Sequence, residues 1–239
     1  MPDSLITAAH HHLRLTTSLG ALRLDIDTTF AAPWSILFGP SGSGKSSVLR
    51  ALCGLLPNMH ATVLRSAETP TNDLTNIPPH RRSIAYAPQQ PALFPHLTVR
   101  DNIAFSSSLH QPANPKLAED ALALFELHPI AHRSPARLSG GERQRVNLAR
   151  AFARPDTRLM LLDEPFTGLD LKLRDQLIPR MHQFLAARSI PCISVTHDVD
   201  EALLLEAEVF RIDAGRIVAF GQARTILADE RARLLNALR

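Results

Sequence analysis

The segment from Gly39 to Ser46 places the tightest constraint on how this chain of 239 residues can fold. It reads GPSGSGKS, follows the apolar run Ser35–Phe38, and leads into residues 47–52, whose apolar side chains recur at helical spacing. Strand, glycine-rich turn and helix, in that order, is the setting in which GxxxxGK[ST] indicates a phosphate-binding loop. The glycines let consecutive backbone N–H groups converge on one anion, and the new helix adds the positive end of its dipole.

We expect specific binding roles for two side chains of this segment. Lys45 is expected to reach the β- and γ-phosphates of a nucleotide, and the Ser46 hydroxyl to ligate Mg²⁺. The alternative is an accidental Gly/Ser loop, but only Lys45, Lys116 and Lys172 are lysines among 26 basic residues, so a chain that prefers arginine uses lysine here. The residues expected to contact nucleotide are Gly39, Pro40, Ser41, Gly42, Ser43, Gly44, Lys45, Ser46 and Ser47.

Charge and hydropathy narrow the class of protein. The net charge of +3 is spread along the chain without a block of like charge, which favours a solvated basic surface over a nucleic-acid partner. Cys53 and Cys192 lie inside apolar runs and are expected to be core residues in a reducing compartment. No apolar stretch approaches the ~20 residues of a membrane span, and no signal peptide is apparent. We therefore expect a cytoplasmic protein whose membrane role, if it has one, requires a partner.

Hydrophobic patterning predicts an α/β fold. Residues 13–30 alternate around Gly20, which indicates two antiparallel strands with Asp25 and Asp27 on the solvent side. Further strands are expected at residues 62–65, 83–87, 159–162, 192–196, 209–212 and 217–220, the last two forming a hairpin. Helices are expected at residues 45–54, 172–188 (kinked or split at Pro179), 199–206 and 223–238.

Residues 98–154 have a different character, because three helical patterns follow one another without a strand pattern. They cover residues 99–108, residues 115–127 with Asn114 as N-cap, and residues 140–153 capped by Ser139. We therefore expect one domain over residues 1–239. Its P-loop NTPase (RecA-like) core would comprise about 1–97 and 155–239, with an N-terminal antiparallel β subdomain, and about 98–154 would form an inserted all-helical subdomain.

Asp163 and Glu164 directly follow the apolar run 159–162, which is typical of a parallel strand buried on both faces. Ligands bind at the carboxyl ends of such strands. Ordinary polarity at a strand end could explain an isolated pair. After a phosphate loop, however, the pair predicts nucleotide hydrolysis, in which Asp163 holds Mg²⁺ through water and Glu164 polarises the attacking water.

A second helix start with the same chemistry lies about a hundred residues after the first. Ser139, Gly140, Gly141 and Glu142 present backbone N–H groups at the beginning of the helix expected over 140–153. A plain N-cap without a ligand is the alternative. One ATP has little need of both helix starts from the same molecule. The economical arrangement is a head-to-tail homodimer, with each nucleotide between Lys45 of one chain and Ser139 of the other.

These motifs, together with Gln89, the TGLD segment ending at Asp170, and His197, resemble the ATP-binding cassette family in their order and over nearly the whole chain. The resemblance implies ATP and Mg²⁺ as cofactors and ATP hydrolysis as the activity. It also implies that Gln89 contacts Mg²⁺ and senses the membrane partner. Ser139 to Glu142 would complete the opposite site, and Asp170 would line the dimer seam. His197 would contact the γ-phosphate and orient Glu164.

One feature departs from the family pattern. Its members usually stack adenine on an aromatic residue in the first strand, and no Phe, Tyr or Trp precedes Phe30. His12 is the best substitute in this part of the chain. Weaker or less base-selective nucleotide binding would follow.

Within the family, the chain resembles bacterial import ATPases, which work with permease subunits and, indirectly, a solute-binding protein. Leu93, Phe94 and Pro95 are expected either to recognise the permease, which would dock near Gln89–His96, or to pack between lobes. The phosphate-loop phrase looks most like molybdate importers, whereas the lack of an extra regulatory domain leaves thiamine, sulfate or iron import open. A non-catalytic ATP-gated clamp is the alternative from another class, and the presence of both Glu164 and His197 favours the hydrolysing motor. The protein would lie peripherally on the inner face of the cell membrane.

Overall fold

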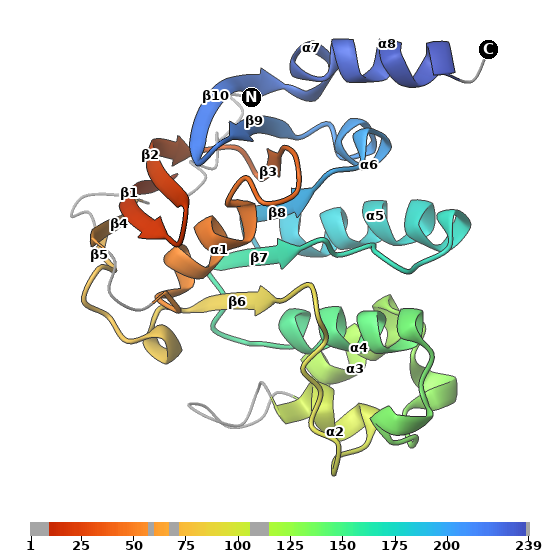
Figure 1. Cartoon of the computed structure of the whole chain (residues 1–239). Helices are drawn as coiled ribbons and strands as arrows, with labels where there is room; N and C mark the ends of the chain where they lie inside the picture. Colours follow the sequence, from red (N-terminus) through yellow and green to blue (C-terminus); the bar gives the residue numbers. More distant parts are fainter. Residues whose placement is uncertain (1–9, 57–59, 67–71, 106–114, 238–239) are drawn as a thin grey trace, which may run out of the picture. The chain divides into compact units, whose positions relative to one another are not determined.

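The computed structural model describes residues 10–56, 60–66, 72–105 and 115–237 (Figure 1). The chain divides into two compact units, of which the first comprises residues 1–82 and 191–239 and the second comprises residues 83–190. The first unit carries the phosphate loop and His197. The second carries Gln89, the Asp163-Glu164 pair and the segment around Ser139.

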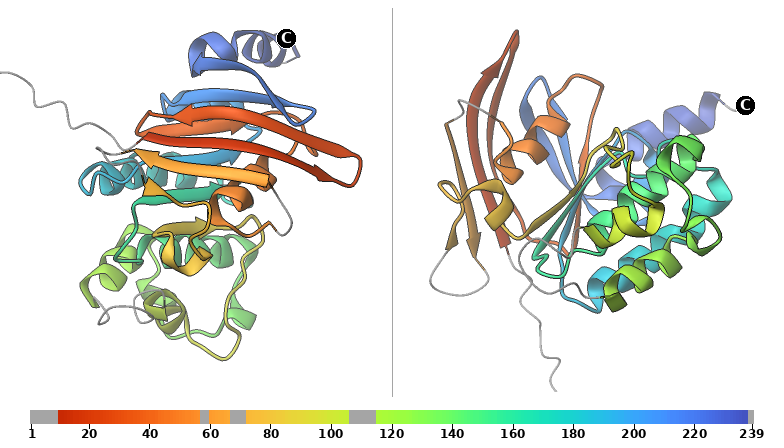
Figure 2. Two further views of the ribbon diagram at one scale, coloured as in Figure 1. Left: turned by 90° about the vertical axis from the view of Figure 1, so that its left-hand side faces the viewer. Right: turned by 90° about the horizontal axis from the view of Figure 1, so that it is seen from below.

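An antiparallel sheet forms the N-terminal part of the first unit, as the alternating sequence predicts (Figure 2). Leu15, Leu24 and Ile26 are buried, whereas Asp25 and Asp27 are exposed, so the predicted alternation is confirmed. The strands, in spatial order, are β2 (Leu22–Phe30), β1 (His10–Leu19), β4 (His60–Ser66) and β5 (Asn72–Asp73).

Four further strands of the first unit lie side by side in the order β10, β9, β3 and β8, and the phosphate loop follows β3. Strand β3 runs parallel to β8 and to β9, and β9 turns back into antiparallel β10. Every residue of β3 and β8 is buried, as expected for strands covered on both faces. Trp34 donates its indole N–H to Ser194 Oγ at 2.9 Å and ties β3 to β8. The bounds are β3 (Trp34–Phe38), β8 (Cys192–Thr196), β9 (Glu208–Asp213) and β10 (Arg216–Gln222).

The helices of the first unit differ from prediction mainly at the C-terminus. The expectation of one continuous helix over 223–238 is wrong, because Leu227 leaves the helical region (φ −104°, ψ 15°) and buries its side chain at the break. The bounds are α1 (Lys45–Cys53), α6 (Val199–Leu204), α7 (Ala223–Ile226) and α8 (Ala228–Ala237), with a 3-10 turn at Pro79–Arg81.

The second unit combines two parallel strands with a group of helices. Strand β6 pairs with β7, and residues 98–105 and 115–154, as far as the structure describes them, contain no strand. The strands are β6 (Ile84–Ala87) and β7 (Leu159–Asp163). The helices are α2 (Val99–Ala104), α3 (Pro115–Leu124), α4 (Gly140–Phe152) and α5 (Leu171–Ala186), with 3-10 turns at His128–Ile130 and Pro135–Arg137.

Helix ends in this unit were the weaker part of the prediction. The helix expected over 115–127 ends at Leu124, and a 3-10 turn follows it. The C-terminal part of the helix expected over 99–108, and the Asn114 cap, lie outside the described residues. Pro179 lies inside α5 without splitting it. The rings of Phe125 and Phe152, 5.2 Å apart, form part of the core beneath α4.

Both cysteines are buried free thiols, as predicted for core residues. Burial raises the pKa of the Cys192 thiol well above its ordinary value, so this side chain remains protonated.

None of the helices that the described residues form is both long and apolar enough to cross a membrane.

Candidate functional site

The phosphate loop connects the end of β3 to the start of α1 (Figure 1). Lys45, the first residue of α1, is buried and folds back over the loop. Its Nζ donates to Gly39 O at 2.8 Å and to Pro40 O at 2.7 Å. A buried ammonium needs such acceptors to offset its lost hydration. The cation is thereby held at the loop, where the sequence places it.

Gly44 fixes the backbone at the start of α1. Its φ is +102°, and a Cβ there would lie 2.4 Å from Cδ2 of Leu24, so a side chain is excluded by conformation and by space. Gly44, the N-cap of α1, has no side chain that could cap the helix, and no acidic residue lies in the first turn. The backbone N–H groups and the dipole of such a helix start suit an anionic ligand.

The loop also holds an unsatisfied hydroxyl. Ser43 Oγ is buried and has no hydrogen-bond partner among the described residues. A buried donor without a partner costs free energy that a bound phosphate oxygen could recover. Together with the Lys45 ammonium and the Ser46 hydroxyl in the first turn of α1, this donor set fits the phosphates and Mg²⁺ of a nucleotide.

Arg82 fixes the other end of α1. Its buried guanidinium donates to the carbonyls of Leu52 at 2.8 Å and Ala51 at 3.3 Å, where α1 ends. Burial lowers the pKa of Arg82 from its ordinary value. A cation at the C-terminus of a helix stabilises the helix dipole. Arg82 thus fixes the helix that presents the phosphate loop.

His12 lies on β1, several residues from the part of the hairpin that contacts the phosphate loop. The strand residue next to the phosphate loop is Leu24, which pairs with Thr17 on β1. His12 is five residues further along β1, about 16 Å away at ~3.3 Å per residue. Its Nε2 lies 2.7 Å from Oδ1 of Asp27. Leu24 lies toward the turn end of this hairpin, and His12 lies toward its other end. The adenine role of His12 stays a prediction.

Asp163 ends the buried strand β7 in the second unit. Its side chain is 1% exposed, and the hydroxyl of Tyr86 on the paired strand β6 donates to Asp163 Oδ2 at 3.2 Å. This hydrogen bond orients the carboxylate. An oriented carboxylate at a strand end is a suitable Mg²⁺ ligand, directly or through water.

Glu164 stands in a strained conformation beside Asp163. Its φ is +46°, a region that non-glycine residues rarely adopt and that costs on the order of 1 kcal/mol or more. Its Oε2 accepts hydrogen bonds from Gln89 Nε2 at 2.9 Å and from Thr167 Oγ1 at 3.2 Å. Gln144 Nε2 donates to the Glu164 carbonyl at 3.3 Å. The carboxylate is thus fixed in place as a hydrogen-bond acceptor, which is what orienting a water molecule requires.

Ser139 caps α4 through a complete capping box. Its hydroxyl accepts the N–H of Glu142 at 3.2 Å, and its own N–H donates to Glu142 Oε2 at 2.7 Å. The backbone hydrogen bond from Ser139 lowers the pKa of Glu142 from its ordinary value of 4.5. The carboxylate therefore stabilises this helix start at pH values above 4.5 and loses that effect as the pH falls through its depressed pKa.

Gly141, in the first turn of α4, lies against the backbone that precedes α5. A Cβ there would lie 2.9 Å from the carbonyl oxygen of Gly168. Asp170 caps α5 by accepting the Leu173 N–H at 2.9 Å. The glycine and the TGLD segment that the sequence analysis named separately are therefore neighbours. The dimer role of Asp170 stays a prediction beside its observed capping role.

The loop around Phe94 is packed rather than free. The backbone N–H of Phe94 donates to Asn102 Oδ1 at 2.8 Å, and Asn102 Nδ2 donates to Phe94 O at 3.1 Å. The Phe94 ring lies 4.4 Å from the Phe105 ring and beneath the Arg150 guanidinium at 5.5 Å. Leu93 and Phe94 are half-buried, whereas Pro95 and His96 are exposed.

Five side chains that hydrogen-bond to or around the predicted residues were not predicted from the sequence: Tyr86, Asn102, Gln144, Thr196 and Glu201. Of the predicted set, the structure brings Gln89 to Glu164 and Lys45 to Gly39 and Pro40. Tyr86 and Gln144 contact residues far away in the sequence, whereas Asn102 and Glu201 bond to residues no more than eight positions away. No motif signals either kind of contact.

Comparison with known proteins agrees with this geometry. Residues 28–167 match the protein family described as ABC transporter. The chain is 36% identical, over 95% of its length and 92% of the relative, to the molybdate/tungstate import ATP-binding protein of Archaeoglobus fulgidus. It is 36% identical to the molybdenum import ATP-binding protein 1 of Azotobacter vinelandii, over 90% of the chain and 60% of the relative. It is 39% identical to the sulfate/thiosulfate import ATP-binding protein of Synechocystis, over 80% and 53%.

The fold is shared with solved structures. A dimeric post-hydrolysis state of the ATP-binding cassette MJ0796, bound to ADP and Pi, superposes with a TM-score of 0.75 at 24% identity. The match covers 90% of this chain and 99% of that one. The P-loop α/β fold with an antiparallel β subdomain and an inserted helical subdomain is therefore confirmed.

Proposed function

The chain belongs to the ABC transporter family, and we propose that it is the ATP-hydrolysing subunit of an importer for a small solute. The observation that carries this proposal is the Glu164 carboxylate, which Gln89 and Thr167 hold in place directly after the buried Asp163. A non-catalytic clamp would have no use for a strained, oriented carboxylate at this point. The geometry therefore favours the hydrolysing motor.

The phosphate loop and the carboxylate pair have different roles in hydrolysis. Lys45 and the N–H groups at the start of α1 bind the β- and γ-phosphates. Ser46, Asp163 and Gln89 would hold Mg²⁺, which supplies charge neutralisation on the phosphate oxygens when it is bound. Glu164 orients the attacking water, and His197 contacts the γ-phosphate.

We assign the second nucleotide contact to another copy of the chain. Ser139 to Glu142 of one copy would close over the nucleotide held by Lys45 of the other, with Asp170 near the seam. The capping box leaves the start of α4 ordered, with glycines at its first two positions. This arrangement makes the homodimer the hydrolysing species.

The membrane contact is assigned to residues 89–96. Pro95 and His96 are exposed, and Asn102 and Phe105 hold Phe94 from behind, so the loop presents a fixed surface. Integral permease subunits would dock there, and a solute-binding protein would act through the permease. We propose no nucleic-acid partner. The chain would lie peripherally on the cytoplasmic face of the membrane.

The solute is assigned as a tetrahedral oxyanion, with molybdate first. A match that spans 95% of this chain and 92% of the relative is to a molybdate/tungstate import protein. A sulfate/thiosulfate import protein is similar over a shorter part of its own length. Sulfate is therefore one alternative, and thiamine and iron are others.

Hydrolysis of ATP by the purified chain tests the proposed activity. Lys45→Ala should abolish Mg²⁺-dependent hydrolysis and nucleotide binding, because it removes the ammonium from the loop. Lys172→Ala is the matched control, since Lys172 is exposed on α5. Activity that survives Lys45→Ala, or that falls equally with Lys172→Ala, would show that the loop is not the nucleotide site.

A further inference from the structure

A ring of three hydrogen bonds encloses the backbone at His197. Thr196, the last residue of β8, donates its hydroxyl proton to Glu201 Oε2 at 2.6 Å. The same hydroxyl oxygen accepts the N–H of Asp198 at 3.0 Å. Asp198 Oδ1 then accepts the N–H of Glu201 at 3.2 Å. The residues on both sides of His197 are therefore tied to one carboxylate on α6.

Two members of this ring are buried polar side chains, which need hydrogen-bond partners. Thr196 is 3% exposed and Glu201 is 7% exposed, whereas His197 between strand and helix is exposed. A buried carboxylate is tolerated only where hydrogen bonds replace its lost hydration. An O–H···O⁻ distance of 2.6 Å is that of a strong, charge-assisted bond. Because the Thr196 hydroxyl both donates and accepts, its orientation is fixed.

We propose that Glu201 is a positioning residue for His197. This inference rests on the proposed function, in which His197 contacts the γ-phosphate of bound ATP. Through Thr196, the Glu201 carboxylate sets the backbone at the turn from which the imidazole projects. A shift of about 1 Å in a catalytic group can cost on the order of 10²-fold in rate, so this restraint has a measurable consequence.

The competing explanation is that Glu201 only stabilises the junction between β8 and α6. Asp198 caps α6 by accepting the N–H groups of Asp200 and Glu201, so the ring also secures a short helix. A purely structural role would lower the melting temperature and the amount of folded protein, whatever residue occupies position 197. If Glu201 positions His197, its replacement should lower kcat only in variants that keep the imidazole.

The experiment measures kcat and KM for ATP in two backgrounds, with histidine or alanine at position 197. Glu201→Ala should lower kcat about tenfold with histidine present, and KM should change by less than about twofold, because phosphate binding stays with Lys45. In the His197→Ala background it should cause no further loss. Glu201→Gln should keep most of the wild-type kcat, because its amide oxygen can still accept the hydrogen bond from the Thr196 hydroxyl.

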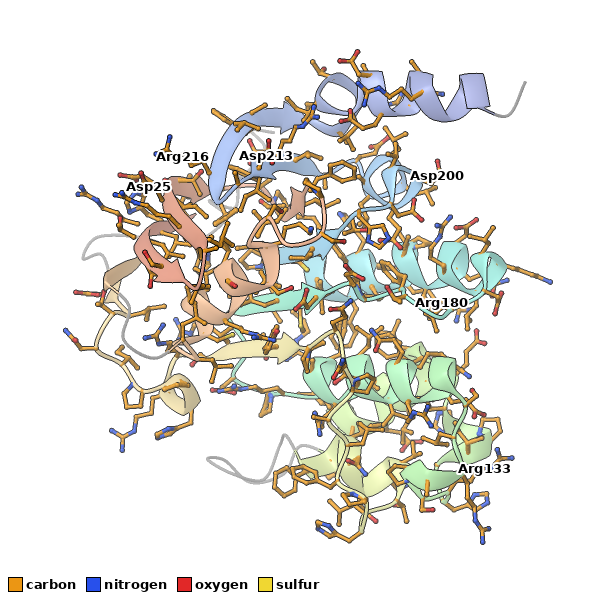
Figure 3. The ribbon with its side chains drawn as sticks, in the orientation of Figure 1. Asp25, Arg133, Arg180, Asp200, Asp213 and Arg216 are labelled. Atoms are coloured by element: carbon orange, nitrogen blue, oxygen red, sulfur yellow. The ribbon has the colours of Figure 1, made fainter. Side chains whose placement is uncertain are left out.

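Three further variants complete the test, two as controls and one that breaks the ring. Asp200→Ala removes an exposed carboxylate from the same helix, one residue before Glu201, and should leave kcat unchanged (Figure 3). Thr196→Ser keeps the hydroxyl and should stay close to wild type, whereas Thr196→Val should reproduce Glu201→Ala.

The outcomes separate the inference from the function on which it rests. An equal fractional loss from Glu201→Ala in both backgrounds, or no rescue by Glu201→Gln, would overturn the positioning role. Absence of hydrolysis by the wild-type chain would instead overturn the proposed function. A loss that depends on His197, with KM preserved, supports the inference.

Discussion

Among single residues, Tyr86 adds most to the expected Mg²⁺ site. It is the only tyrosine of the chain, and its hydroxyl donates to the buried Asp163 carboxylate. Groups that hydrogen-bond a metal-ligating carboxylate commonly tune metal affinity as strongly as some ligands do. Tyr86 therefore belongs to the candidate site, although its position in a short apolar strand gives no sign of it.

Tyr86→Phe removes only this hydroxyl and should raise the Mg²⁺ concentration needed for half-maximal hydrolysis, by about tenfold on the scale of such contacts. A Mg²⁺ titration of ATPase activity measures the shift, and thermal unfolding of the same variant reports any loss of stability. An unchanged Mg²⁺ requirement would mean that the hydroxyl only satisfies a buried carboxylate.

At the level of elements, the loop of residues 89–96 depends on α2. Asn102, which is fully buried in α2, makes hydrogen bonds to the backbone of Phe94, Leu97 and Thr98. One amide thus fixes the loop, and the Phe94 ring packs on Phe105. The loop combines packing with exposure, so both interpretations of its apolar residues find support in different side chains.

Phe94→Ser should abolish solute uptake in cells while the purified chain still hydrolyses ATP, because the change alters the surface offered to the permease. Phe220→Ser is the matched control, since Phe220 is a 66% exposed phenylalanine on β10. Loss of folding in Phe94→Ser, detected by circular dichroism, would show that the ring serves packing alone.

Elements whose sequence carries the signal directly were predictable. The alternation in β1 and β2, the unbroken apolar runs of β7 and β8, and the start of α1 at Lys45 follow from local pattern. The break at Leu227 did not, because burial of one side chain outweighed helical periodicity. Asn102 and Glu201 were likewise not predicted, because their roles come from burial and from side-chain hydrogen bonds that no sequence pattern signals.

At the scale of the whole molecule, we expect subunits other than this chain to select the solute, so uptake in cells is the relevant readout. Deleting the chromosomal copy should abolish molybdate accumulation at nanomolar supply. The intact chain should restore it, and Lys45→Ala should not. Normal molybdoenzyme activity in the deletion strain, with sulfate or another nutrient limiting instead, would reassign the solute and keep the transporter role.

We expect the dimer to be the hydrolysing species and the Glu164 carboxylate to be required for hydrolysis within it. Glu164→Gln keeps the shape of the side chain and removes its negative charge, so ATP should still bind. Without a carboxylate to orient water, the nucleotide-bound dimer should persist. Its Mg²⁺-dependent formation can be followed by size-exclusion chromatography with light scattering.

The most direct test of this account is the single-turnover hydrolysis rate of Glu164→Gln beside the wild-type chain. We expect the rate to fall by about 10²–10³-fold, the usual cost of removing one such group, while an ATP-dependent dimer accumulates. A Glu164→Gln variant that hydrolyses ATP at the wild-type rate would contradict the assignment of Glu164 and the mechanism built on it.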